Sequence, residues 1–125
     1  MSAQMVSVAD GVLTVRVGGQ LKVSELQAMQ KAAADAIEKS GKARVLCLAD
    51  DFLGWEKSSG WGDVSFQARY DPFIEKIAIV GDRKWEDLTL LFTSKGIRRV
   101  PIEYFAPSDL AKARAWLAAA PESTQ

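Results

Sequence analysis

The apolar run at residues 45–49 (VLCLA) is the feature that most constrains how this chain folds. A strand made of these residues is apolar on both faces, which is typical of a strand in the middle of a helix-covered parallel sheet. Two acids, Asp50 and Asp51, end the run, and a glycine-containing loop leads from them toward a helix. Sheets of this kind usually bind their ligands at such strand-to-helix turns, so we expect functional residues directly after this central strand.

The residues before the central strand predict a hairpin and a helix. Apolar residues alternate through 5–17 on either side of Asp10-Gly11, a dipeptide typical of tight hairpin turns. We expect Gly18-Gly19 to end the second strand of the hairpin. Ser24 and Gln27 form a capping box that opens the helix. The expected apolar face of this helix comprises Leu26, Met29, Ala33 and Ile37.

After Gly41, a helix C-cap signal, strands and helices continue to alternate. A weak helical pattern covers 58–70, an apolar run at 74–80 predicts a strand, and another helix is expected from about residue 84 to 94. The side expected to face inward in this last helix comprises Trp85, Leu88, Leu91 and Phe92.

The C-terminal part predicts an edge strand and a final helix. Pro101 lies inside the alternating segment 99–105, and prolines in strands are confined to sheet edges or bulges. Ser108 is expected to cap a helix, and 121–125 to fray. The order β-β-α-β-α-β-α-β-α over 1–125 is typical of a single α/β domain with a mixed, mostly parallel sheet packed against helices. The expected inner face of the final helix comprises Leu110, Ala113, Trp116 and Leu117.

Composition argues against several functions. The 16 basic and 16 acidic residues cancel, and no basic stripe is present, so nucleic-acid binding is not expected. The absence of histidine removes the usual catalytic triads and the usual near-neutral general base, so we expect a protein that is not an enzyme. No nucleotide-binding glycine motif occurs, and adjacent strand residues such as Asp50 and Asp51 point to opposite faces. We therefore expect neither a cofactor nor a metal.

Cys47 is the only cysteine, so no internal disulfide can form, and its apolar neighbours predict an inert core thiol. These features fit a reducing compartment. Because the N-terminal residues lack a signal-peptide pattern and no apolar run is long enough to span a membrane, we expect a cytoplasmic location.

Aromatic residues are the strongest candidates for a binding site. Six of the eleven in the chain lie in or beside the segment after the central strand: Phe52, Trp55, Trp61, Phe66, Tyr70 and Phe73. They either line a pocket or a contact surface, or they fill the core. In the same segment, Ser58 and Ser59 precede a predicted helix, where a serine serves as an N-cap or carries a phosphate near the positive end of the helix dipole.

Three segments of the chain resemble SpoIIAA-like proteins, small bacterial proteins grouped with the STAS and Sec14 (CRAL-TRIO)-like domains. The segments are LADDFLGW at 48–55, IEKIAIVGDRKWEDL at 74–88 and VPIEYFAPSDLAKARAWL at 100–117. The resemblance implies a STAS-like fold, and the Sec14 relationship implies contact with an apolar ligand or a membrane surface.

A second resemblance concerns the sequence KSSGWG at 57–62. It is similar to the Asp-Ser-Ser-Gly-Leu-Gly loop of anti-sigma-factor antagonists, in which the first serine is phosphorylated. That serine corresponds to Ser58, and Lys57 stands where the family has aspartate. This resemblance implies a regulatory switch that binds or releases a protein partner.

We therefore predict a non-enzymatic cytoplasmic binding module that contacts an apolar small molecule, a membrane surface or a regulatory protein. The predicted contact residues are Phe52, Trp55, Trp61, Phe66 and Tyr70. The alternative is a partner switch controlled by phosphorylation of Ser58. The sequence also leaves open a homodimer, in which the partner is a second copy of this chain.

Overall fold

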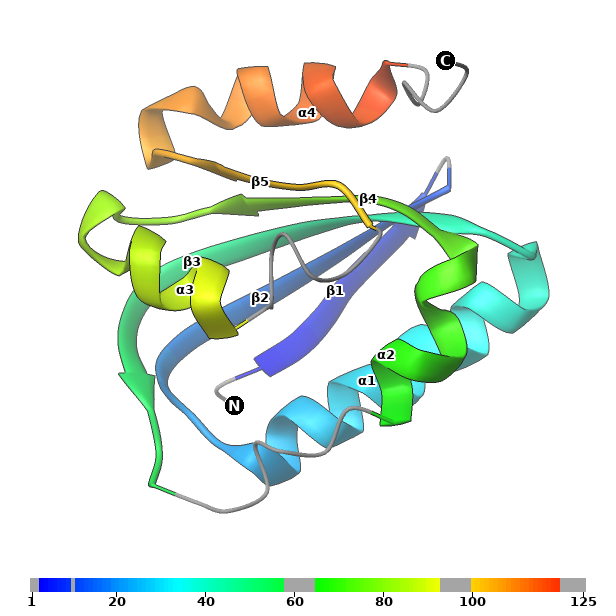
Figure 1. Ribbon diagram of the computed structural model, residues 1–125, viewed down its shortest axis with the longest axis horizontal. Helices are drawn as coiled ribbons and strands as arrows, with labels where there is room; N and C mark the ends of the chain where they lie inside the picture. The colour runs from blue at the N-terminus through cyan, green and yellow to red at the C-terminus, as the bar shows by residue number, and fades with distance from the viewer. Residues whose placement is uncertain (1–2, 10, 58–64, 93–99, 120–125) are drawn as a thin grey trace.

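The computed structural model describes residues 3–9, 11–57, 65–92 and 100–119. Within them, five strands form one sheet in the order β1-β2-β3-β4-β5 (Figure 1). The strands are β1 (Ala3–Ala9), β2 (Val12–Leu21), β3 (Ala43–Trp55), β4 (Ile74–Val80) and β5 (Ile102–Phe105). β1 pairs antiparallel with β2, and every other neighbouring pair is parallel. The predicted mixed, mostly parallel sheet and the peripheral last strand are thus confirmed.

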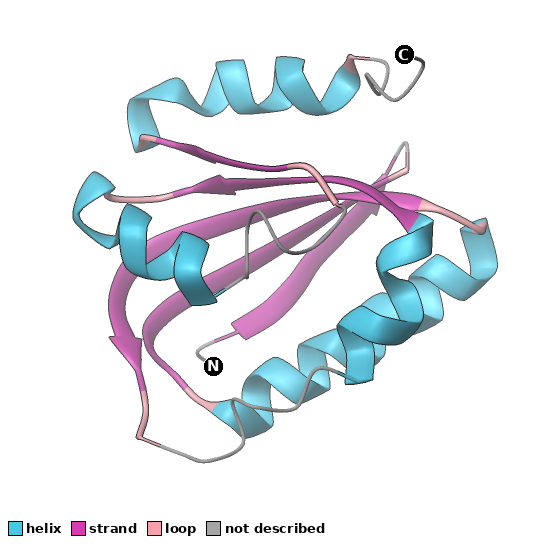
Figure 2. Cartoon of the chain, in the orientation of Figure 1, coloured by secondary structure: helices cyan, strands magenta, loops and turns pink. Residues whose placement is uncertain are grey.

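Helices cover both faces of this sheet (Figure 2). They are α1 (Val23–Ser40), α2 (Ser65–Tyr70), α3 (Glu86–Phe92) and α4 (Leu110–Ala118), with short 3-10 turns η2 (Asp71–Phe73), η3 (Arg83–Trp85) and η4 (Pro107–Asp109). α1, α2 and α3 contribute side chains to the core on one face, and α4 packs on the other. We call these faces the α1 side and the α4 side. The predicted order of strands and helices is confirmed.

The structure confirms two sequence predictions for α1, its apolar face and its C-cap, and contradicts the prediction for its N-terminus. Its predicted apolar face is buried or packed against the core, and Gly41 ends it in the left-handed region at φ 84°. The predicted capping box is wrong, because the helix begins at Val23 and no side chain caps its N-terminus from Lys22. Instead, the Val23 N–H donates to Glu56 Oε2 at 2.8 Å. A carboxylate 33 residues away therefore occupies the positive end of the helix.

β2 and β3 both extend beyond their predicted ends, which are Gly18-Gly19 for β2 and Asp50-Asp51 for β3. β2 continues through Gly18-Gly19, with register irregularities on either side of Gly19 at φ 59°. β3 continues through Asp50 and Asp51 because its second half pairs with the end of β2, where Phe52 is the partner of Gly19. Asp51 at φ 52° and Gly54 at φ 102° accommodate the bending of this extension. Long-range strand pairing thus overrides local turn signals, and the predicted ends of both strands are wrong.

Two basic residues hold the C-terminal end of α4 on the sheet. Arg44 of β3 and Lys76 of β4 are neighbours across the strands. The Lys76 Nζ donates to the carbonyl oxygens of Trp116 at 2.7 Å and Ala119 at 3.1 Å, and Arg44 donates to those of Leu117 and Ala119. Cations at this negative helix end stabilise it. These interactions supply acceptors for a buried lysine, since only 3% of Lys76 is exposed.

Two expectations for the later helices are wrong. The structure shows no side-chain cap at the start of α4, which follows η4 with Asp109 at the N-cap position, so Ser108 does not cap this helix. On α3, Leu88 and Leu91 are exposed, while Leu90 packs against the core. The helix is only seven residues long, so its inward face is set by how η3 enters it rather than by its own periodicity.

Candidate functional site

The described members of the predicted aromatic surface lie in two places. Phe52 and Trp55 are in the last part of β3, within the core cluster that also receives side chains from the N-terminal half of α1. Phe66 and Tyr70 are on α2 and pack against the core from the α1 side. Trp61 falls in 58–64 and so lies outside the described residues. The structure therefore brings Phe52 and Trp55 together, and separately Phe66 and Tyr70.

Trp85 of η3 completes the first aromatic group. Its ring centroid lies 5.2 Å from that of Phe52 and 6.0 Å from that of Trp55, and Phe52 and Trp55 are 4.9 Å apart, all in edge-to-face geometry. Phe52 is buried. The Trp85 Nε1 is also buried and has no hydrogen-bond partner among the described residues. Edge-to-face packing of three rings stabilises the end of β3, so this group forms a rigid wall. The signal for Trp85 was its position just after β4, at the same sheet edge.

On the α1 side, cross-strand neighbours form two apolar rows. One row comprises Leu13, Val45, Ile77 and Ile102. The next comprises Val15, Cys47, Ile79 and Tyr104. The residues on the strands that flank the centre are mostly buried, whereas those of β3 are only partly buried. We call the four partly buried residues Val45, Cys47, Ala49 and Ile77 the central strip.

The central strip departs from what a central parallel strand normally shows. Such strands are covered on both faces, and on the α4 side Leu46 and Ala78 are indeed fully buried. On the α1 side, α1 packs on β1 and β2, and α3 packs on β5. α2 reaches the same core through Phe66 and Tyr70, and an apolar strip of β3 nevertheless stays partly exposed. The predicted continuous apolar strand is present, but only the tertiary structure reveals that one of its faces is partly exposed.

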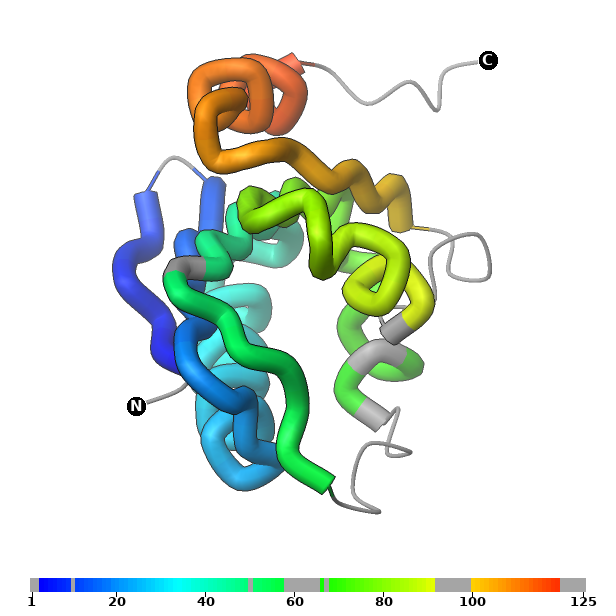
Figure 3. Tube along the Cα trace, turned by 90° about the vertical axis from the view of Figure 1, so that its left-hand side faces the viewer, coloured from blue at the N-terminus to red at the C-terminus, as the bar shows by residue number. Residues whose placement is uncertain are grey.

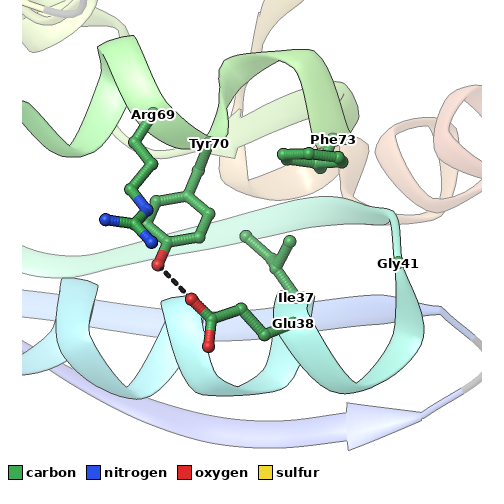
Figure 4. Close-up of a pocket in the computed structure, with 6 residues that line it drawn as sticks. All are labelled: Ile37, Glu38, Gly41, Arg69, Tyr70 and Phe73. Carbon is green, nitrogen blue, oxygen red and sulfur yellow. Dashed lines mark hydrogen bonds between the residues drawn. The ribbon is translucent and has the colours of Figure 1, made fainter.

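One pocket, of about 320 Å³, lies between α1 and α2 near the beginning of β3 (Figure 4). It is lined by Ile37, Glu38, Gly41, Arg69, Tyr70 and Phe73. The Tyr70 Oη donates to Glu38 Oε2 at 2.6 Å, which ties α2 to α1. This hydrogen bond raises the pKa of Tyr70, because it stabilises the protonated phenol next to a carboxylate. In Figure 4, Ile37 points from α1 toward the ring of Phe73, so the pocket has an apolar side and a polar side.

A second pocket, of about 630 Å³, lies at the carboxyl ends of β3 and β4, where parallel sheets usually bind ligands. It is lined by Ala49, Asp51, Phe52, Leu53, Asp82, Lys84, Trp85 and Pro107. Ala49 also belongs to the central strip, so this pocket adjoins the end of the strip. Its lining combines apolar side chains with the charged side chains of Asp51, Asp82 and Lys84.

The turn beside this pocket is held in one conformation. Asp82 Oδ1 accepts from the Lys84 N–H at 2.9 Å, and the Tyr104 Oη donates to the Asp82 carbonyl at 2.7 Å. Burial, followed by the nearby charge of Asp82, raises the pKa of Tyr104 to about 12. A Cβ on Gly81 would lie 2.7 Å from the Tyr104 Oη, so this position requires glycine.

Cys47 lies in the middle of the central strip. Part of this residue is exposed, but apolar neighbours surround its thiol. The resulting loss of hydration raises the pKa of the thiol to about 12, so the thiol stays protonated near neutral pH. The strip contains no charged side chain. It therefore offers apolar contact rather than a nucleophile or a general base.

The other candidate residues give no second site. Ser58 and Ser59 lie outside the described residues. In the parts of the chain that the structure describes, no three metal-ligating side chains of the His, Cys, Asp or Glu type come together. Among the described helices, none is both long and apolar enough to span a membrane.

Comparison with known proteins decides the family. A model of the SpoIIAA-like family matches residues 12–118, which is most of the chain. This chain belongs to the SpoIIAA-like family. The predicted resemblance is confirmed, and the α/β fold described above is the SpoIIAA-like fold.

A solved structure supports the same assignment of the SpoIIAA-like fold. It is the crystal structure of an uncharacterised protein of the DUF3478 family from Shewanella loihica PV-4. The TM-score is 0.67 at 16% sequence identity, and the match covers 93% of this chain and 92% of the other. No curated protein sequence matches this SpoIIAA-like chain. At such low identity the likeness concerns the fold alone.

Proposed function

We propose that this SpoIIAA-like protein is a non-enzymatic binding module that holds the acyl chain of a fatty acid or lipid on the α1 side of its sheet. The observation that carries the proposal is the partial exposure of Val45, Cys47 and Ala49 on the central strand. Exposed apolar surface in the middle of a sheet is costly in water, and an apolar ligand would remove that cost.

The surroundings of the central strip support an acyl chain in particular. The strip runs along β3 from the neighbourhood of the pocket between α1 and α2 to the pocket at the carboxyl end. Each methylene that a ligand buries there contributes roughly 0.8 kcal/mol. Both pockets carry charged side chains, Glu38 and Arg69 in one and Asp51, Asp82 and Lys84 in the other, so a polar head group would find partners at either end.

Aromatic residues supply the walls for this ligand. Phe66 and Tyr70 stand on α2, with ring centroids 5.1 Å apart, and the rigid group containing Phe52 and Trp85 stands at the carboxyl end. In this proposal the aromatic residues predicted as contact residues lie at the borders of the central strip. Trp61 stays a predicted contact residue, and a phosphate on Ser58 stays a separate prediction, which mass spectrometry of protein from its native cells would test.

Two substitutions by phenylalanine, on opposite faces of β3, test the proposal. Val45→Phe adds a ring over the strip and should abolish binding of palmitic or oleic acid, which we expect native mass spectrometry to detect on the wild-type protein. Leu48→Phe is the matched control, because Leu48 is partly buried against the α4 side. It should retain binding.

The melting temperature of each variant should be measured first, since overpacking costs typically about 1–3 kcal/mol. A wild-type protein that binds no fatty acid or phospholipid in native mass spectrometry would contradict the proposal. Equal binding by the folded Val45→Phe and Leu48→Phe variants would show that any binding occurs outside the central strip.

A further inference from the structure

β1 is the outer strand at one edge of the sheet. In the described part of the chain it pairs only with β2, and Figure 3 shows it at the outer margin of the molecule. Its sequence, AQMVSVA, contains no charged residue and no proline. Val6 and Val8 are 46% and 56% exposed, and Ser7 and Ala9 between and beyond them are also exposed. The backbone of an edge strand presents a row of N–H and C=O groups that another extended strand can pair with.

The opposite edge of the sheet is protected against such pairing. β5 has four residues, follows Pro101 directly and carries the exposed Glu103. α4 also packs along it. Short length, proline and charge are the devices by which natural proteins block strand pairing at an edge. β1 has none of these three devices, although its pairing with β2 is irregular between Met5 and Ser7, so its regular edge runs from Ser7 to Ala9. The two edges are thus unequal.

We infer that β1 is an interface with a second copy of this chain, paired antiparallel across a twofold axis that passes within residues 6–8. The two sheets then join into one continuous sheet. A second copy fits because an uncharged strand meets its own copy without placing like charges opposite each other. An antiparallel pair also follows directly from twofold symmetry, in which the same patch serves both copies.

The high β-propensity of Val6 and Val8 favours this pairing, since β-branched side chains pack well against cross-strand neighbours. A seven-residue strand alone buries less than the roughly 1,200–2,000 Å² of a standard stable interface. The dimer should accordingly dissociate on dilution. Other strands, such as an extended peptide of a different protein, would compete for the same edge and would leave the isolated protein monomeric.

Sedimentation velocity of the purified protein from about 1 to 200 µM is the first test, because this range covers weak interfaces. The mass should rise from 13.6 kDa to twice that value. Val8→Lys should raise the protein concentration at the monomer–dimer midpoint at least about tenfold, because each copy would then bring a positive charge to the paired edge. Leu91→Lys is the control, because Leu91 is exposed on α3 away from β1. It should leave the midpoint unchanged.

The second test fixes the geometry. Single cysteines at positions 6, 7 and 8, introduced into a Cys47→Ala protein, should yield a disulfide-linked dimer for at least one of them under mild oxidation. Directly opposed antiparallel residues have Cα atoms about 4.5–5.5 Å apart, within the range of a disulfide. Ser108→Cys, on the exposed η4, should not crosslink.

A protein that stays monomeric throughout the concentration range overturns the inference, and binding of an added peptide would then identify a different occupant. A dimer that is insensitive to Val8→Lys, or that crosslinks at none of the three positions, overturns it as well. Circular dichroism of each variant confirms that the changed proteins are folded.

Discussion

Lys76 should be among the most sensitive positions for stability, although it faces the α4 side of the sheet, opposite the proposed ligand. Its ammonium group is buried, donates to the carbonyl oxygens of Trp116 and Ala119, and lies 4.7 Å from the centre of the Trp116 ring. Lys76→Met keeps most of the side-chain volume while removing the charge and the donor. The change therefore isolates the contribution of the ammonium group from that of packing.

The expected loss follows from opposing effects. Leaving the partly buried Trp116 carbonyl without its donor costs about 1–3 kcal/mol, and loss of the favourable helix-end charge costs about 0.3–1 kcal/mol. Removing a desolvated ammonium offsets part of this loss. Arg44 still donates to the Ala119 carbonyl. We expect a net destabilisation of about 1–3 kcal/mol, which corresponds to a melting temperature lower by roughly 4–12 °C for a chain of this size.

Urea unfolding followed by circular dichroism measures this free energy. Lys112→Met is the matched control, because Lys112 lies exposed on the same helix and its nearest carboxylate oxygen, on Asp109, is 3.8 Å away. It should change stability by less than about 0.5 kcal/mol. A Lys76→Met protein as stable as the wild type would refute the reasoning, because it would show that desolvation cancels everything that the ammonium group contributes.

Three further predictions concern single side chains. The thiol of Cys47 should react slowly with a disulfide reagent in the folded protein, because burial raises its pKa to about 12; fast labelling would contradict this. Gly81→Ala should destabilise the protein by about 1–3 kcal/mol, and adding Tyr104→Phe should recover part of the loss by removing the clashing hydroxyl. Arg44 lowers the pKa of Glu75 below the ordinary 4.5, so the stability that Glu75 contributes is present above pH 4.5 and is lost as the pH falls through the lower folded value. The difference in unfolding free energy between the wild type and Glu75→Gln should therefore shrink in acid, and a constant difference would exclude this ion pair as the cause.

The candidate site could be predicted only in part. The sequence indicated the segment after the central strand, and the structure places Phe52 and Trp55 there, at the carboxyl end of the sheet. Trp85 belongs to the same group but lies 30 residues further along the chain than Trp55, so no local pattern connects them. The partial exposure of Val45 and Cys47 was equally hidden, because periodicity reports that a residue is apolar and not how closely the helices cover it.

What the sequence by itself determined is the succession of strands and helices, the C-cap at Gly41 and the edge position of the strand after Pro101. These features depend on side-chain periodicity and on backbone preferences that act within a few residues. The tertiary structure alone decided that Glu56 caps α1, that β3 extends to Trp55 and that Lys76 is tolerated in the interior. Each of these depends on a partner more than 30 residues away in sequence, and a buried charge or a free helix end is stabilised only once the fold brings that partner within hydrogen-bond distance.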